Sequence, residues 1–170
     1  TNSGIQNRIF GIKDINFPNF QNVNVGNITN CTNANASCPN DSKLGWYVDL
    51  QKKQKLTAKP SIFKNTLYVP VYEPSSSNIC STGNAYLYGF DPKCGKSLLS
   101  VKVGSGVLTE VVSIKEKIYV GIAGEAEKNI GQNFESVDNL ISGNVVNNSA
   151  AGGGSNSGSM VTESWKENYN

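Results

Sequence analysis

The chain contains no histidine, one methionine and few charged side chains. Its 170 residues include 15 lysines and arginines against 13 aspartates and glutamates, so the formal net charge is only +2. Without histidine, neither a Ser-His-Asp nor a Cys-His catalytic arrangement can form within the chain. Nucleic-acid binding usually requires a clear basic face, which this charge does not favour. No run of about 18 apolar residues occurs, so we expect no membrane insertion.

Carboxylates and lysines are the remaining candidates for catalysis. The acidic candidates Asp49, Glu73, Asp91 and Glu110 each lie at an expected strand end or turn, where such residues are common, so we interpret them as structural. The glycine-rich segment 152–158 does not link a strand to a helix, as a phosphate-binding loop would. We therefore expect a non-enzymatic protein with no catalytic residue and no cofactor.

Four cysteines in a chain without histidine favour disulfides over a metal site. Zinc sites favour close pairs such as C-x-x-C, and the cysteine spacings here do not fit that pattern. We expect Cys31 to pair with Cys38 across a short loop. Cys80 and Cys94 then form the second pair, which requires the loop before their intervening strand to fold back along the sheet. Disulfides persist in oxidising compartments such as the periplasm or the cell exterior, so we expect an exported protein.

Alternating apolar and polar residues between turn-forming residues predict an all-β fold. In the segment 44–50, the side chains of Leu44, Trp46, Val48 and Leu50 share one face, which we expect to be buried. A hairpin is predicted from 56–63 and 66–73, turned at Lys64-Asn65, because Asn tolerates the left-handed conformation of a tight turn. No amphipathic helix of normal length is evident. Further strands are expected at 7–13, 84–90, 97–103, 107–114, 117–122 and 160–167.

Strand-turn-strand units recur at about 45 residues, a spacing typical of propeller blades. We expect one module over 1–170, with antiparallel, four-stranded partial blades at 7–50, 56–103 and 107–167. Two long polar segments, 14–43 and 125–159, are predicted loops, and a brief apolar phrase at 137–146 allows one short strand. A propeller typically has about four to eight blades. Either the remaining blades lie on another polypeptide, or the strands close into a small β-sandwich.

The long loops are the expected sites of partner recognition, because rigid sheets commonly present function on their connections. Asn-x-Ser/Thr triplets begin at Asn27, Asn30, Asn35 and Asn40. In a eukaryotic secretory host these asparagines would be glycosylation acceptors, whereas in a bacterium we interpret them as ordinary polar residues of a loop. Aromatic side chains could form a carbohydrate platform, but their strand spacing favours the core. The aromatic residues in question are Trp46, Tyr47, Tyr68, Tyr72, Tyr86, Tyr88 and Phe90.

Several phrases of the chain occur in the order found in a known family. They are RIFGIKD at 8–14, GWYVDL at 45–50, KPSI at 59–62, CSTGNAYLYGFD at 80–91 and ESWKE at 163–167. Together they cover most of the chain outside its two Asn-rich stretches. The chain resembles the C-terminal propeller region of the PilC/PilY-type proteins, which are tip-associated adhesins of bacterial type IV pili.

The resemblance implies an exported, non-enzymatic protein at the pilus tip. It implies a role in pilus assembly or against retraction, with minor pilins, a host surface or the upstream propeller blades as partners. The family is normally much longer, and the chain starts without an initiator Met or a signal peptide, so we expect a processed or excised C-terminal piece. The Asp-rich calcium loop of the family is not found here, so no metal ligands are carried over.

Two other interpretations remain open on the sequence. The phrase YLYGFDP also fits a quinoprotein-like propeller fragment of a periplasmic oxidoreductase. That function would need cofactor-stacking tryptophans and calcium ligands. An independent β-sandwich adhesin is the third possibility.

Overall fold

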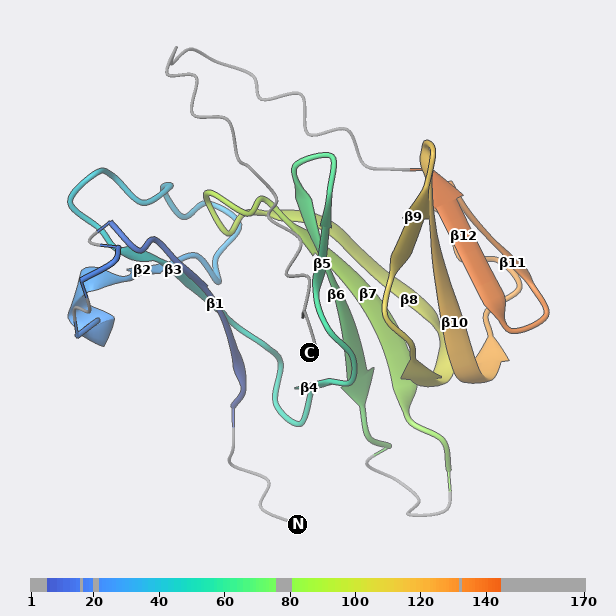
Figure 1. Ribbon diagram of the computed structural model, residues 1–170. Coiled ribbons are helices and arrows are strands. Elements are labelled where there is room, and N and C mark those ends of the chain that lie inside the picture. Colours follow the sequence, from blue (N-terminus) through green and yellow to red (C-terminus); the bar gives the residue numbers. More distant parts are fainter. Residues whose placement is uncertain (1–5, 16, 20–21, 76–80, 132, 145–170) are drawn as a thin grey trace, which may run out of the picture.

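A computed structural model describes residues 6–15, 17–19, 22–75, 81–131 and 133–144. Within these ranges the regular structure consists of strands and one short 3-10 helix, without an α-helix (Figure 1). The strands pair mostly antiparallel, and neither of the two sheets closes on itself. The all-β prediction is therefore confirmed, whereas these open sheets do not by themselves establish the predicted partial propeller blades.

The first sheet contains the strands nearest the amino terminus. Its strands are β1 (Arg8–Ile12), β2 (Thr29–Asn30) and β3 (Gly45–Asp49), arranged in the order β1-β3-β2. β1 and β3 are antiparallel, with Arg8 opposite Asp49 and Ile12 opposite Gly45, and β2 adds in parallel to β3. The 3-10 helix Val25–Asn27 and β2 lie within the predicted loop 14–43.

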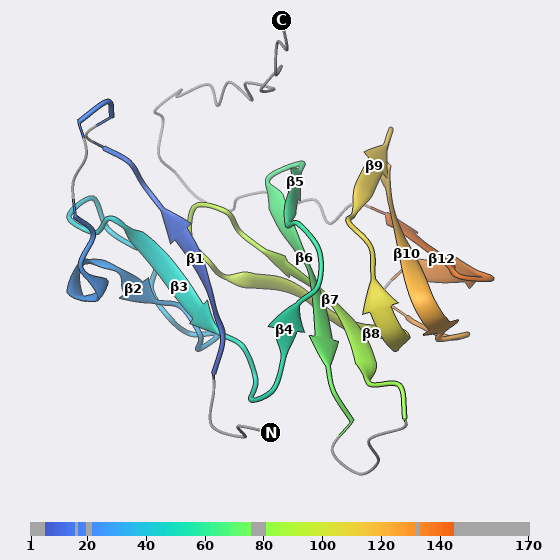
Figure 2. The ribbon, with the colours of Figure 1, turned by 60° about the horizontal axis from the view of Figure 1, so that its bottom comes forward.

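The second sheet has nine strands and falls into two sections. The central section comprises β4 (Lys55–Leu56), β5 (Ser61–Phe63), β6 (Thr66–Glu73), β7 (Asn84–Phe90) and β8 (Ser97–Leu108). The last section comprises β9 (Val112–Ile114), β10 (Lys117–Ala126), β11 (Phe134–Val137) and β12 (Leu140–Asn144). Figure 2 shows the first sheet, the central section and the last section side by side, in chain order.

The central section follows the prediction closely. The hairpin formed by β5 and β6 turns at Lys64 and Asn65, and both residues have positive φ, 45° and 58°. The expected strand 56–63 is divided into β4 and β5, with Pro60 between them, because proline cannot donate to a ladder. β6, β7 and β8 then pair as an antiparallel meander.

The last section departs from the prediction in two ways. Residues 134–144, inside the predicted loop 125–159, form the hairpin of β11 and β12. β12 then pairs with β10, so that the strand order is β11-β12-β10 rather than a simple meander. The expected strand 160–167 lies outside the described residues.

β8 joins the central and last sections because it takes part in both. Its first part pairs with β7, and its last part, Gly104 to Leu108, pairs with β10. Where β8 pairs with β10, Gly106 lies opposite Gly124, and their φ values are 123° and 155°. A Cβ atom on either glycine would overlap a carbonyl oxygen of the facing strand. Only glycine permits this close approach and this backbone conformation.

The central section buries both of its faces. Along β6, Val69 and Val71 face the first sheet, whereas Tyr68 faces the last section. Along β7, Phe90 likewise faces the first sheet and Leu87 faces the last section. The molecule therefore has two apolar cores, one at each junction. The first junction contains Ile9, Cys31, Trp46, Val48, Leu50, Val69, Val71, Tyr88 and Phe90. The second junction contains Tyr68, Ala85, Leu87, Leu99, Val101, Val103, Leu108, Val111, Ile118, Val120, Ile122, Phe134 and Ile141.

Candidate functional surfaces

Trp46 packs between the first sheet and the central section. Its indole is 2% exposed and lies against Gly11 of β1 and Gly95 of the turn that follows β7. A side chain on either glycine would overlap the ring. The indole Nε1 donates a hydrogen bond to the carbonyl oxygen of Pro92 at 2.9 Å. Burial of a large aromatic side chain with a satisfied N–H makes this contact the centre of the first junction.

A disulfide crosses the same junction. Cys38 of the first long loop bonds Cys94 of the turn beside Trp46, across 56 residues of sequence. The expected pairing of Cys31 with Cys38, and of Cys80 with Cys94, is therefore wrong. Spacing along the chain favoured local pairs, but the packing of Trp46 brings the 91–96 turn to the loop of another sheet.

The two other cysteines have different positions. Cys31 is a free thiol, 4% exposed, packed in the core of the first junction, and burial raises its pKa. Cys80 lies outside the described residues. The disulfide that is present indicates a non-reducing compartment, in agreement with the expected export. In the described part of the chain, no helix is long and apolar enough to cross a membrane.

A buried polar network also lies in the first junction. Gln54 is 1% exposed, and its amide nitrogen donates to a Glu73 carboxylate oxygen at 3.0 Å and to the Tyr88 hydroxyl at 2.9 Å. Its carbonyl oxygen accepts from the backbone N–H of Gln51 at 3.2 Å. Since each polar atom of the Gln54 side chain has a partner, the network can be buried without a large penalty. Burial raises the pKa of Tyr88.

The acidic residues singled out in the sequence have mostly structural partners. Asp49 forms an ion pair with Arg8 at 2.6 Å, and Glu73 belongs to the Gln54 network. Asp91 accepts from the backbone N–H groups of Lys93 and Cys94 within its own turn. Glu110 is an exposed residue of the connection between β8 and β9.

Most of the aromatic residues lie in the two cores. Trp46, Tyr68, Tyr88 and Phe90 are buried, as strand spacing predicts. Tyr47, Tyr72 and Tyr86 are half-buried. Tyr47 carries Arg8 over its ring, at 4.8 Å from the guanidinium carbon to the centroid, and its ring lies 6.0 Å from that of Phe10.

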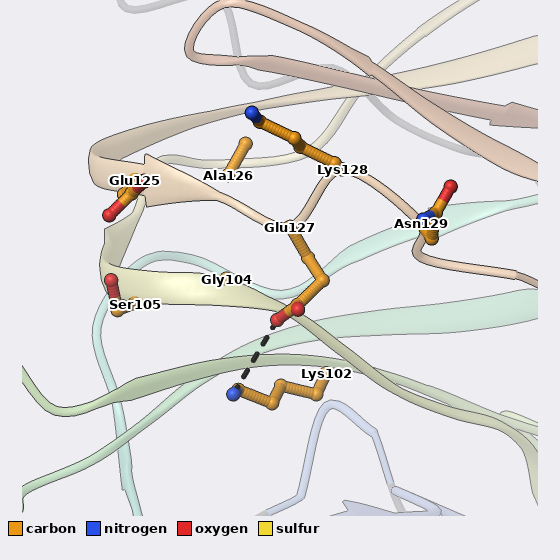
Figure 3. Close-up of a pocket in the computed structure, with 8 residues that line it drawn as sticks. All are labelled: Lys102, Gly104, Ser105, Glu125, Ala126, Glu127, Lys128 and Asn129. Carbon is orange, nitrogen blue, oxygen red and sulfur yellow. Dashed lines mark ion pairs between the residues drawn. The ribbon is translucent and has the colours of Figure 1, made fainter.

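An open groove lies beside the paired ends of β8 and β10 (Figure 3). It has a volume of about 360 Å³ and contains one ion pair, from Lys102 Nζ to Glu127 Oε2 at 3.5 Å. The Lys128 and Asn129 side chains point away from this pair and from each other in Figure 3. In a small-molecule site a few polar groups converge on one point, and the polar groups of this groove do not. Among the described residues, no group of three or more acidic, cysteine or histidine side chains could hold a metal ion.

Apolar side chains gather on the outward faces of the first sheet and of the last section. On the first sheet, Phe10 and Ile12 lie on the face opposite to the buried Ile9 of β1 and are 47% and 49% exposed. With Tyr47 they form what we call the first outward face. On the last section, exposed apolar residues lie on the face opposite to the buried Ile118, Val120 and Ile141. This last outward face consists of Val112, Ile114, Tyr119, Val137 and Leu140.

Comparison with known proteins yields no relative. No protein-family model, no curated protein and no solved structure matches the chain.

Proposed function

We propose that the chain is part of a larger β-propeller, in which the first sheet, the central section and the last section each correspond to a blade, and that it serves as a non-enzymatic C-terminal module of a type IV pilus tip-associated adhesin and assembly factor. The observation that carries this proposal is the contrast between the two-sided burial of the central section and the exposed apolar faces on either side of it. A sheet covered on both faces is the environment of an interior propeller blade.

The outward faces need apolar neighbours. Contiguous exposed apolar surface on a soluble protein is typical of an interface. Val112, Ile114, Val137 and Leu140 are between 47% and 69% exposed, whereas the alternating residues of β10 are almost completely buried. Companion sheets that cover these faces would repeat the packing of the two junctions. We propose the upstream blades of the same parent protein as these companions.

The pilus assignment is supported by where the family-like phrases lie. RIFGIKD supplies β1, GWYVDL supplies β3, and the end of LYGFD supplies Phe90 and Asp91 at the start of the turn beside Trp46. Phrases that are remote in sequence thus build one junction. Their joint occurrence is more informative than any single phrase, since they depend on each other physically.

The proposed partners beyond the companion blades are minor pilins or a host cell surface. The long loop of residues 22–43 is the candidate contact, because it projects from the first sheet and is held in place by Cys38. Neither a nucleic acid nor a lipid bilayer is proposed as a partner.

The proposal is tested in the longer parent protein that it assumes, in the organism that produces it. Replacing Leu140 by Lys puts a charge on the last outward face. Replacing the exposed Ser113 of β9 by Lys is the control, because Ser113 lies opposite Ile118 and therefore not on that face. We expect Leu140→Lys to reduce the number of surface pili and to increase protease cleavage of the parent protein, while Ser113→Lys leaves both unchanged. Normal pilus numbers and protease resistance in Leu140→Lys would contradict the proposal. A quinone chromophore bound to the purified parent protein would favour the oxidoreductase alternative instead.

A further inference from the structure

A free thiol lies beside the disulfide of the first junction. The Cys31 thiol donates to the carbonyl oxygen of Ser37 at 4.0 Å. Ser37 directly precedes Cys38, which carries the crosslink to Cys94. The Cys31 N–H also donates to the Tyr47 carbonyl of β3 at 2.8 Å, which holds this residue in the first sheet. The first junction therefore contains three cysteines, of which two are bonded and one is free.

The three cysteines differ in exposure. Cys31 and Cys94 are 4% and 5% exposed, whereas Cys38 is an exposed residue of the loop 22–43. Packing in the first core keeps the Cys31 thiol away from solvent, and burial raises its pKa. Because the thiolate is the species that attacks a disulfide, the closed junction protects the crosslink from its neighbouring thiol.

The crosslink is favoured by packing and not by the unpacked chain. The bond from Cys38 to Cys94 spans 56 residues of sequence, while Cys31 and Cys38 are seven residues apart. The entropy lost when a loop closes grows with its length, and for these two lengths it favours the local pair roughly twentyfold in an unpacked chain. Contacts such as those of Trp46 with the 91–96 turn therefore maintain the long-range bond.

We propose that these three cysteines form a reversible thiol-disulfide latch that responds to opening of the first junction. When the junction opens, the Cys31 thiol loses its proton to solvent and its thiolate attacks the Cys38 sulfur. The bond from Cys31 to Cys38 forms as the bond from Cys38 to Cys94 breaks. The electron pair of the broken bond leaves on the Cys94 sulfur, which takes up a proton. One disulfide and one thiol are present before and after, so no oxidant or reductant is needed.

The exchange would release the first sheet from the central section. The present bond joins the loop 22–43 to the 91–96 turn, whereas the new bond lies within the loop. The two parts then remain linked only through the backbone of residues 50–54, between β3 and β4. When the junction closes again, the Cys94 thiolate attacks Cys38 and restores the long-range bond. The latch is independent of the proposed pilus function, because it needs no companion polypeptide.

Thiol labelling and peptide mapping of the full chain test the latch. Cys80 is replaced by Ser in every sample, so that three cysteines remain, and trypsin places Cys31 and Cys38 in one peptide and Cys94 in another. Samples held at pH 8 are acidified and labelled with excess N-ethylmaleimide in acidic urea. We expect the label on Cys31 after incubation in buffer, and on Cys94 by roughly twentyfold after incubation in urea. Removal of urea at pH 8 should return the label to Cys31.

Two substitutions connect the exchange to the first junction. In buffer at pH 8, Trp46→Ala should raise the ratio of Cys94 label to Cys31 label at least about tenfold, because it weakens the packing that maintains the long-range bond. Tyr47→Ala, on the opposite face of β3, is the control and should leave the ratio unchanged. Equal ratios in the two variants would overturn the proposal, as would label that stays on Cys31 in urea.

A urea series separates opening of the junction from unfolding of the whole chain. The Cys94 label should appear at urea concentrations at which the amides of β10 and β12 still resist hydrogen exchange. If the Cys94 label appears only when these amides lose protection, the latch does not respond to the first junction and the proposal is wrong. Since these samples contain no companion sheet, that result would leave the proposed propeller assembly standing.

Discussion

The two junctions of the molecule are held together in different ways. At the first junction, the first sheet meets the central section through side chains: Trp46 in its glycine-lined site, the Cys38–Cys94 disulfide and the Gln54 network. At the second junction, one strand, β8, belongs to both sections, and glycines allow it to cross β10 closely. The second junction also has an apolar core, but its shared strand links the two sections through the backbone, and single side-chain changes do not remove that link. The first junction should therefore open separately from the second.

Trp46→Ala should have the largest effect. It removes a fully buried indole and the hydrogen bond to Pro92, and losses of this kind cost about 3–5 kcal/mol in unfolding free energy. Urea unfolding followed by tyrosine fluorescence measures the change, and Tyr47→Ala on the opposite face of β3 is the control. Hydrogen exchange within β10 and β12 should remain native-like. Equal loss of protection in all sheets would show that the junctions do not open separately.

Removal of the disulfide should weaken the same junction. Because the crosslink joins residues 56 apart, the chain-entropy estimate of its contribution is about 4 kcal/mol. The double variant Cys38→Ser/Cys94→Ser should show a lower thermal midpoint and faster proteolysis in the loop 22–43. Wild-type protein in a reducing agent should behave in the same way. A midpoint unchanged by both treatments would contradict the assigned role of the bond.

Gly106→Ala tests the second junction. The added methyl group would overlap the Ala123 carbonyl oxygen, and the backbone has φ of 123°, so we expect a loss of about 1–3 kcal/mol or more. Gly131→Ala is the matched control, since its φ is also positive, at 75°, but its Cβ would meet no atom within 4 Å. Exchange should increase in β8 and β10 before it increases in β1 and β3. If both variants lose the same unfolding free energy, the close approach of β8 and β10 is not the cause of the loss.

The smallest effect is expected at high pH. Burial raises the pKa of Tyr88, and the charges of Tyr86 and Glu73 add to this, while the Gln54 hydrogen bond opposes it. The stability that depends on neutral Tyr88 is present below about pH 10, the pKa of an unfolded tyrosine, and is lost as pH rises through the folded-state pKa. Tyr88→Phe should reduce this alkaline loss, as measured by urea midpoints from pH 8 to 11. Tyr119→Phe, in the last section, is the control. The same alkaline slope in Tyr88→Phe and wild-type protein would contradict this prediction.

Local patterns in the sequence predicted the strands but not how the sheets meet. The positive φ of Lys64 and Asn65 and the buried face of Trp46, Val48 and Leu50 follow from nearest-neighbour chemistry, which a single sequence contains. The bond of Cys38 to Cys94 depends on a contact between sheets, so spacing could not identify it. The short strand allowed at 137–146 overlaps β12, but its partner β11 and the pairing of β12 with β10 were not predicted, because they depend on contacts between strands rather than on a local pattern.

Side-chain footprinting of the two outward faces tests the central proposal most directly. Phe10, Ile12, Val112, Ile114 and Leu140 would be labelled by a photoactivated carbene in the isolated chain and in the intact parent protein. Ile62, which is 59% exposed on the edge strand β5 of the central section, is the internal control. The expected result is a several-fold loss of labelling at both outward faces in the parent protein, with Ile62 unchanged. Equal labelling of these faces in the two samples would mean that no companion sheets cover them, and would contradict the proposed propeller.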